Sequence, residues 1–196
     1  MTHPAFTALL DAARAAHATH ADLAEFCAFP DDLTTAPTTP FHIPAARLME
    51  QDQTLAGAHP LARAFLAASP HAQWRETYKA TDIGADFMDR FACYCLIGAG
   101  GPWVSGQFSA YVVYMPPHLH YRWHHHPAEE LYFVLAGQAE FYREGAAPET
   151  LRAGQSSFHA SGQPHAMQTR DSSVMAYVLW RNHLETPPVL TEREVA

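Results

Sequence analysis

The second half of this chain consists of short runs of aromatic and β-branched residues, separated by residues that favour turns. From about residue 91 onward these runs recur at short and regular intervals, a pattern typical of the strands of a β-sandwich or β-barrel. We expect strands at 91–97, 111–115, 131–135, 139–142, 157–159, 166–169 and 174–180. Between the third and the fourth of these, Ala136-Gly137-Gln138 is expected to form a tight hairpin turn.

The first 90 residues predict helices instead. Apolar side chains recur at near-helical intervals from Pro4 to about Phe29, and Pro30 ends this segment. Pro44 at a first helical turn predicts a second helix that reaches about Gln53, and further helices are expected at 60–68 and around 72–78. The chain should therefore be mainly β, with a helical N-terminal extension over residues 1–90 and a barrel over residues 91–196.

Composition excludes several classes of protein. An apolar fraction of 48% is ample for a packed core. The net charge of −8, with only twelve Lys and Arg, argues against nucleic acid as a partner, because phosphate binding needs clustered basic charge. No apolar run is long enough for a membrane span, and the N-terminus does not resemble a signal peptide. Cys27, Cys93 and Cys95 have no metal-binding spacing, so we expect reduced thiols in a cytoplasmic protein.

Histidines are crowded into one short segment. The chain has fourteen, and five of them lie between His118 and His126. Within this segment, His124-x-His126-x3-Glu130-x6-Gly137 matches the first of the two cupin motifs. His124 and His126 are two residues apart on a strand, so both side chains leave the same face. Glu130 returns on the next strand, where its carboxylate can meet both imidazoles, and Gly137 permits the expected turn.

A fourth ligand is expected from a distant strand. The stretch Gly154-x5-Ala160-x-Gly162-x2-His165 matches most of the second cupin motif and supplies His165. Three imidazoles and one carboxylate leave open positions on one divalent ion such as Zn, Fe(II) or Mn, which is the arrangement of a catalytic site. The motifs depart from their usual pattern at turn and packing positions, namely His118, Ala160 and Thr169.

The run of three histidines also allows a frame that is shifted by one residue. His125 would then face the site and Glu129 would supply the carboxylate. The spacing to Gly137 favours Glu130, so we keep the first frame.

Two tyrosines lie close to the motif. Tyr132 is two residues past Glu130, so on a strand its phenol faces the same way as the carboxylate. A divalent cation beside it would lower the phenol pKa below its usual value of about 10, which would suit a base or a ligand. Without that role the ring is a core aromatic. Tyr121 precedes the histidines and could face the same cavity.

Three segments together resemble one family of enzymes. GPWVSG at 101–106, HHHPAEELYFVLAG at 124–137 and SGQPHA at 161–166 are similar to segments of the cupin-type dimethylsulfoniopropionate (DMSP) lyases, particularly those of the DddQ type. The resemblance implies a single jelly-roll cupin barrel that cleaves a zwitterionic sulfonium substrate to dimethyl sulfide and acrylate. It implies Tyr132 as the base that removes the proton next to the carboxylate, with Tyr121 assisting. Candidate aromatic faces for the sulfonium are Trp103, Tyr114, Trp123 and Trp180.

Two other functions fit the same ligands. An Fe(II)-dependent cupin dioxygenase would share the three-His, one-Glu set but would require oxygen. A non-catalytic cupin that binds a small ligand is the second alternative, although no helix-turn-helix signature accompanies the barrel. The apolar outer-face residues Leu131, Phe133 and Leu135 need a cover, either the N-terminal helices or a second copy in a homodimer.

Overall fold

The computed structural model describes residues 2–55 and 57–192. Its helices are α1 (Pro4–Thr19), α2 (Ala21–Phe26), α3 (Pro44–Gln51), α4 (Pro60–Ala68) and α5 (Ala85–Arg90), with short 3₁₀ turns at Gln53–Leu55 and Ser69–His71. Its strands are β1 (Thr34–Thr35), β2 (Ala92–Ile97), β3 (Trp103–Val104), β4 (Ser109–Met115), β5 (His120–His125), β6 (Glu129–Arg143), β7 (Glu149–Arg152), β8 (Ser156–His159), β9 (His165–Gln168), β10 (Val174–Arg181) and β11 (Val189–Leu190).

Three helices, α1, α3 and α4, begin at the prolines that predict them, but two expectations about the helices were wrong. The long first helix is broken at His20, whose extended backbone (φ −117°, ψ 115°) separates α1 from α2. Residues 72–78 do not form a helix: Gln73 bridges to Phe41 and Trp74 bridges to Tyr94. The Trp74 ring packs edge-on against Tyr94 at a centroid distance of 4.7 Å, so burial of a large aromatic overrides the local helical preference.

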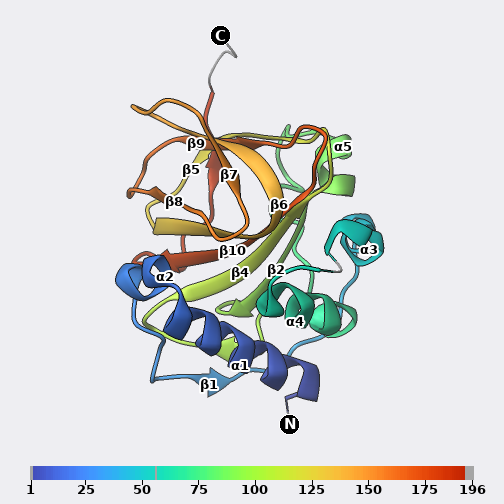
Figure 1. The fold of residues 1–196 in the computed structure, drawn as a ribbon, viewed down its shortest axis with the longest axis vertical. Helices are drawn as coiled ribbons and strands as arrows, with labels where there is room; N and C mark the ends of the chain where they lie inside the picture. Colours follow the sequence, from blue (N-terminus) through green and yellow to red (C-terminus); the bar gives the residue numbers. More distant parts are fainter. Residues whose placement is uncertain (1, 56, 193–196) are drawn as a thin grey trace.

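Two sheets share the long strand β6 (Figure 1). The first sheet has the order β1-β3-β2-β4-β10-β6-β8, and in it β6 pairs through residues 129–137 with β10. The second has the order β7-β6-β9-β5-β11, and in it β6 pairs through residues 138–143 with β7 and β9. The two sheets enclose a barrel interior, and α1, α2 and α4 lie on the outer side of the first sheet (Figure 1), where α1 contacts β2 while α2 and α4 contact β6. The prediction of a mainly β barrel with N-terminal helices is confirmed.

The expected hairpin turn at Gly137 was wrong, because β6 continues through it. Gly137 has a φ of 70°, and a Cβ at this position would lie 1.9 Å from the carbonyl oxygen of Ser173. That carbonyl accepts a hydrogen bond from the amide of Gln138 at 3.1 Å. The register with β10 also shifts close by, since Met175 pairs with Ala136 and Ala176 pairs with Val134. A bulge plus a glycine therefore bends β6 from one sheet into the other.

Side chains of the first sheet alternate between two apolar cores. Outward-facing residues pack against the helices in one cluster, to which β6 contributes Leu131, Phe133 and Leu135. The cover that these three residues require is therefore supplied by the N-terminal helices. Inward-facing residues fill the barrel in a second cluster, to which β6 contributes Tyr132 and Val134. Among the described residues, no helix combines the length and the apolar character that a membrane crossing would need.

Candidate metal centre

The four expected ligands come from three neighbouring strands. His124 is near the end of β5 and His126 directly follows it, Glu130 is near the start of β6, and His165 begins β9. β5 and β9 are antiparallel neighbours, with His124 opposite His165. Each of the four residues is at most 3% exposed. A polar group at this depth requires a partner, so the cluster must be satisfied by its own members or by an ion.

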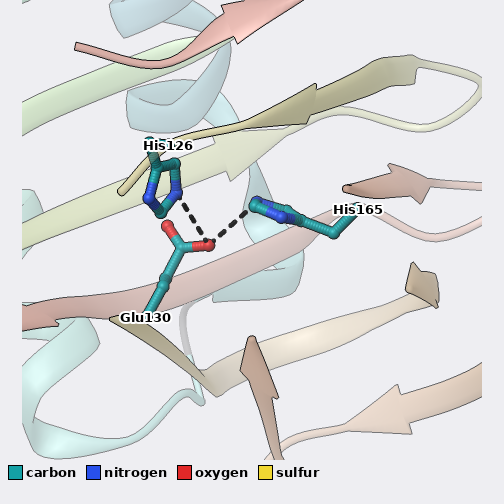
Figure 2. Close-up of side chains that lie close together, drawn as sticks. All are labelled: His126, Glu130 and His165. Carbon is teal, nitrogen blue, oxygen red and sulfur yellow. Dashed lines mark ion pairs between the residues drawn. The ribbon is translucent and has the colours of Figure 1, made fainter. Parts of the chain in front are cut away.

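Three of the four side chains meet at one carboxylate oxygen (Figure 2). Glu130 Oε2 lies 3.0 Å from His165 Nε2 and 3.5 Å from His126 Nε2. The ligand atoms of these three residues all lie within 4.8 Å of one another. Burial by itself would raise the pKa of Glu130, but the adjacent His126 and His165 imidazoles and its hydrogen bonds hold that pKa well below its usual value.

The imidazoles are oriented by backbone carbonyls. The Nδ1 atoms of His124, His126 and His165 lie 2.8, 3.0 and 2.8 Å from the carbonyl oxygens of residues 122, 128 and 163. A carbonyl only accepts, so each Nδ1 carries a proton, and in the neutral imidazole each Nε2 therefore has a free lone pair. The Nε2 atoms of His126 and His165 are buried and make no hydrogen bond, and the polar atom that both of them face is Glu130 Oε2. Two such imidazole nitrogens beside a carboxylate fit a divalent metal ion.

His124 lies beside this group of three. Its ring packs edge-on against His165 at a centroid distance of 4.1 Å and stacks on Tyr121 at 3.9 Å. Burial, followed by the neighbouring His165, lowers the pKa of His124 well below its usual value, so its imidazole is neutral. Neutral imidazole is the form that binds metals.

The residues of the shifted frame are engaged elsewhere. His125 Nδ1 lies 2.7 Å from the Thr191 hydroxyl, and Glu129 accepts a hydrogen bond from Arg181 at 2.9 Å. Both contacts lie at the rim of the barrel, where the side chains are partly exposed. Neither residue belongs to the His–Glu group.

His159, which was not predicted as a site residue, is 1% exposed and contacts the same carboxylate. Its Nδ1 lies 3.0 Å from Glu130 Oε2, and its ring stacks on His165 at a centroid distance of 4.1 Å. Burial lowers the pKa of His159 to about 4, with a further contribution from His165. On the opposite side, the indole of Trp180 donates to Glu130 Oε1 at 2.7 Å. The inward-facing alternation of the 157–159 strand was the available signal for His159.

The two candidate tyrosines border a cavity that also reaches Glu130. Tyr121 and Tyr132 line this cavity together with Tyr111, Trp180 and Arg75. Both tyrosines are at most 5% exposed, and burial raises the pKa of each well above its usual value. Tyr121 also exchanges a hydrogen bond with the buried hydroxyl of Tyr78 at 2.7 Å.

Only one of the four aromatics expected around the substrate lines this cavity, namely Trp180. Tyr114 faces the outer core and donates to Asp52 at 2.9 Å, while Trp103 packs at the edge of that core. Trp123 also lies outside the cavity lining, and its ring centroid is 6.4 Å from that of Tyr142. The sequence alone does not predict whether an isolated aromatic side chain points into the barrel or away from it, because the strand register decides which face of the sheet it occupies.

Two residues that depart from the usual cupin motifs, His118 and Thr169, still adopt the backbone turn and make the loop hydrogen bonds expected of the glycine and asparagine they replace. His118 adopts a left-handed backbone with a φ of 58°, in the place of the usual glycine. Thr169 is fully buried, and its hydroxyl donates to the carbonyl of Pro116 at 2.6 Å and accepts from the amide of Leu119 at 2.9 Å. These bonds fix the loop before β5, so the departures leave the His–Glu group in place.

A barrel of two sheets that share one long strand, with a His–Glu group at the strand ends, defines a cupin. Within this class, a family model for dimethylsulfoniopropionate lyases matches residues 16–176. DMSP lyase DddQ of Ruegeria pomeroyi is 56% identical over 195 residues, which cover 98% of this chain and 97% of that protein. The chain therefore belongs to the DMSP lyase family.

Solved structures agree with this assignment. The crystal structure of DMSP lyase DddQ from Ruegeria pomeroyi superimposes with a TM-score of 0.94 at 56% identity, and covers 97% of this chain and 98% of that one. A second crystal structure, described as that of the DMSP lyases RdDddP and RnDddQII, has a TM-score of 0.91 at 34% identity, with 98% and 100% covered. The likeness thus extends over the helices as well as the barrel.

Proposed function

We propose that this protein cleaves DMSP to dimethyl sulfide and acrylate by a metal-dependent β-elimination. One observation carries the proposal. The Nε2 atoms of His126 and His165, which make no hydrogen bond, flank the Glu130 carboxylate at a cavity that two buried tyrosines also line. Membership of the DMSP lyase family supports the choice of substrate.

One divalent ion, Zn, Fe(II) or Mn, would be held by His126, Glu130 and His165, with His124 as the fourth ligand. Bound there, it would act as a Lewis acid that stabilises the negative charge developing on the substrate carboxylate. The carbonyls behind each Nδ1 keep the imidazoles in the metal-binding tautomer.

Tyr132 is the proposed base. Its phenolate oxygen takes the proton from the carbon next to the carboxylate, and the released electron pair forms the carbon–carbon double bond. The bond from the β-carbon to sulfur then breaks, so dimethyl sulfide leaves as a neutral molecule and acrylate remains. Because burial raises the pKa of Tyr132, the phenolate forms only if positive charge lies close to it. Tyr121, anchored by Tyr78, would assist by hydrogen bonding.

Aromatic side chains in the cavity favour a cationic sulfonium. Trp180 and Tyr111 pack edge to face there with a centroid distance of 5.5 Å, and both line the cavity wall. A cation over such rings gains attraction from their electron-rich faces. Tyr111 thus takes the place of Trp103, Tyr114 and Trp123, which the sequence suggested but which do not line this cavity. The three cysteines are free thiols, which fits a cytoplasmic location.

The decisive experiment is incubation of purified, metal-loaded protein with DMSP while headspace dimethyl sulfide and acrylate are measured. Release of both in equal amounts is expected. A metal-replete protein that binds DMSP but releases neither product would contradict the lyase proposal and favour a ligand-binding cupin.

A further inference from the structure

We propose that His159 is a positioning residue that holds the Glu130 carboxylate in its metal-binding orientation, with Ser157 completing a hydrogen-bond relay behind it. The inference rests on the proposed metal site and names a further residue on which that site depends. Three groups form the relay: the Ser157 hydroxyl, the His159 imidazole and one carboxylate oxygen of Glu130.

Strand pairing places the relay next to the proposed metal site. β8 runs antiparallel to the start of β6, with His159 opposite Glu130 and Ser157 opposite Tyr132. Both β8 side chains are buried, at 1% and 4% exposed, so they face the barrel interior beside their partners. Phe158 between them is 39% exposed, as the alternation along a strand requires.

The proton positions follow from the partners. A carboxylate only accepts hydrogen bonds, so His159 Nδ1, which is 3.0 Å from Glu130 Oε2, must carry the proton. His159 Nε2 is then an acceptor, and the Ser157 hydroxyl donates to it at 3.2 Å. Both ring nitrogens are thereby occupied, which leaves His159 without a lone pair for the metal. It differs in this from His126 and His165, whose Nε2 atoms make no hydrogen bond.

The Glu130 carboxylate consequently accepts one hydrogen bond from each of the two strands that neighbour β6 at this point. Trp180 on β10 donates to Oε1 at 2.7 Å, while His159 on β8 donates to Oε2. Two donors on opposite sides prevent rotation of the carboxylate and keep Oε2 directed at His165 and His126, 3.0 and 3.5 Å away. Outer partners of this kind typically contribute about 10–100-fold to metal affinity.

The test compares metal affinity in three variants by competition with a chelator. His159→Leu removes the donor, and its affinity for Zn²⁺ should fall about 10–100-fold. His159→Asn places a side-chain N–H near the position of Nδ1, so it should recover most of the loss. In His159→Gln, which has a similar polarity, the side-chain amide extends toward Ser157 rather than toward Glu130. Its Zn²⁺ affinity should therefore be as low as that of the Leu variant. The Asn–Gln pair separates loss of the hydrogen bond from loss of packing, even if the Leu variant fails to fold.

Cobalt substitution provides the second readout. The visible spectrum of the Co²⁺-loaded parent reports the number and type of ligands, and His159→Asn should keep its shape. A spectrum that shows one imidazole ligand fewer would mean that His159 binds the metal directly, which overturns the positioning role. Equal Zn²⁺ affinities in the Asn and Gln variants would also overturn the positioning role. A parent protein that binds no Zn²⁺ would overturn the proposed metal site as well, whereas tight binding without DMSP cleavage would refute only the lyase activity.

Discussion

Burial of His17 should make the stability of this protein depend on pH. His17 lies on the inner face of α1 and is 5% exposed. Its ring stacks on Phe108 at a centroid distance of 5.6 Å and meets Phe29 edge-on at 5.2 Å. Burial lowers the pKa of His17 to about 4, against a smaller opposing contribution from the backbone of Cys27. Over a range of pH, therefore, the His17 imidazole stays neutral in the folded protein while the same imidazole in the unfolded chain binds a proton.

The size of the effect follows from the two pKa values. An unfolded histidine has a pKa of about 6.5, so between about pH 6.5 and pH 4 the unfolded state binds a proton that the folded state does not. The free energy of unfolding therefore decreases as the pH falls through this window and is unaffected by His17 above it. The shift from 6.5 to about 4 corresponds to about 3 kcal/mol over the whole window, and about 2 kcal/mol of it should be lost between about pH 7 and pH 5.

The assay is urea unfolding of the parent and of His17→Gln at both pH values, with metal present. The Gln variant should be less stable at neutral pH, because an amide fills the aromatic pocket poorly. However, its loss of stability on acidification should be smaller than that of the parent by about 2 kcal/mol. His42, which is exposed, provides the control, and His42→Gln should keep the pH dependence of the parent. If His17→Gln loses as much stability on acidification as the parent does, the reasoning fails.

The other predictions concern the site and the bend of β6. Metal content in purified, folded His126→Ala and His165→Ala should fall to the level of a chelated sample, and full occupancy in the latter would remove it from the ligand set. Turnover with Zn or Mn should persist without oxygen, whereas a strict oxygen requirement would favour the dioxygenase. Tyr132→Phe should retain metal but lose about 10²–10⁴ in rate, and activity within about fivefold of the parent would refute the base assignment. Gly137→Ala should lower the thermal midpoint, because its Cβ would collide with the Ser173 carbonyl.

The local sequence pattern was sufficient to predict the architecture and the grouping of three of the four proposed metal ligands. The spacing of His126, Glu130 and His165 predicted a common site, and the structure places their ligand atoms within 4.8 Å of one another. The motif spacing works because strand periodicity fixes which face each side chain takes. Most strands of the second half were predicted for the same reason. β3, β7 and β11 were missed because they have only two to four residues, and the six-residue helix α5 was missed as well.

Tertiary contacts decided the remainder. Gly137 is compatible with a positive φ in a tight turn or in a bent strand, and only the close approach of the Ser173 carbonyl selects the bent strand. Likewise, nothing near Ser157 and His159 in the sequence indicates Glu130, because the register between β8 and β6 brings them together. The sequence by itself thus determined which residue types gather on each strand face, since that depends on short-range periodicity. Which faces meet was decided by the pairing of distant strands, whose register depends on packing throughout the barrel.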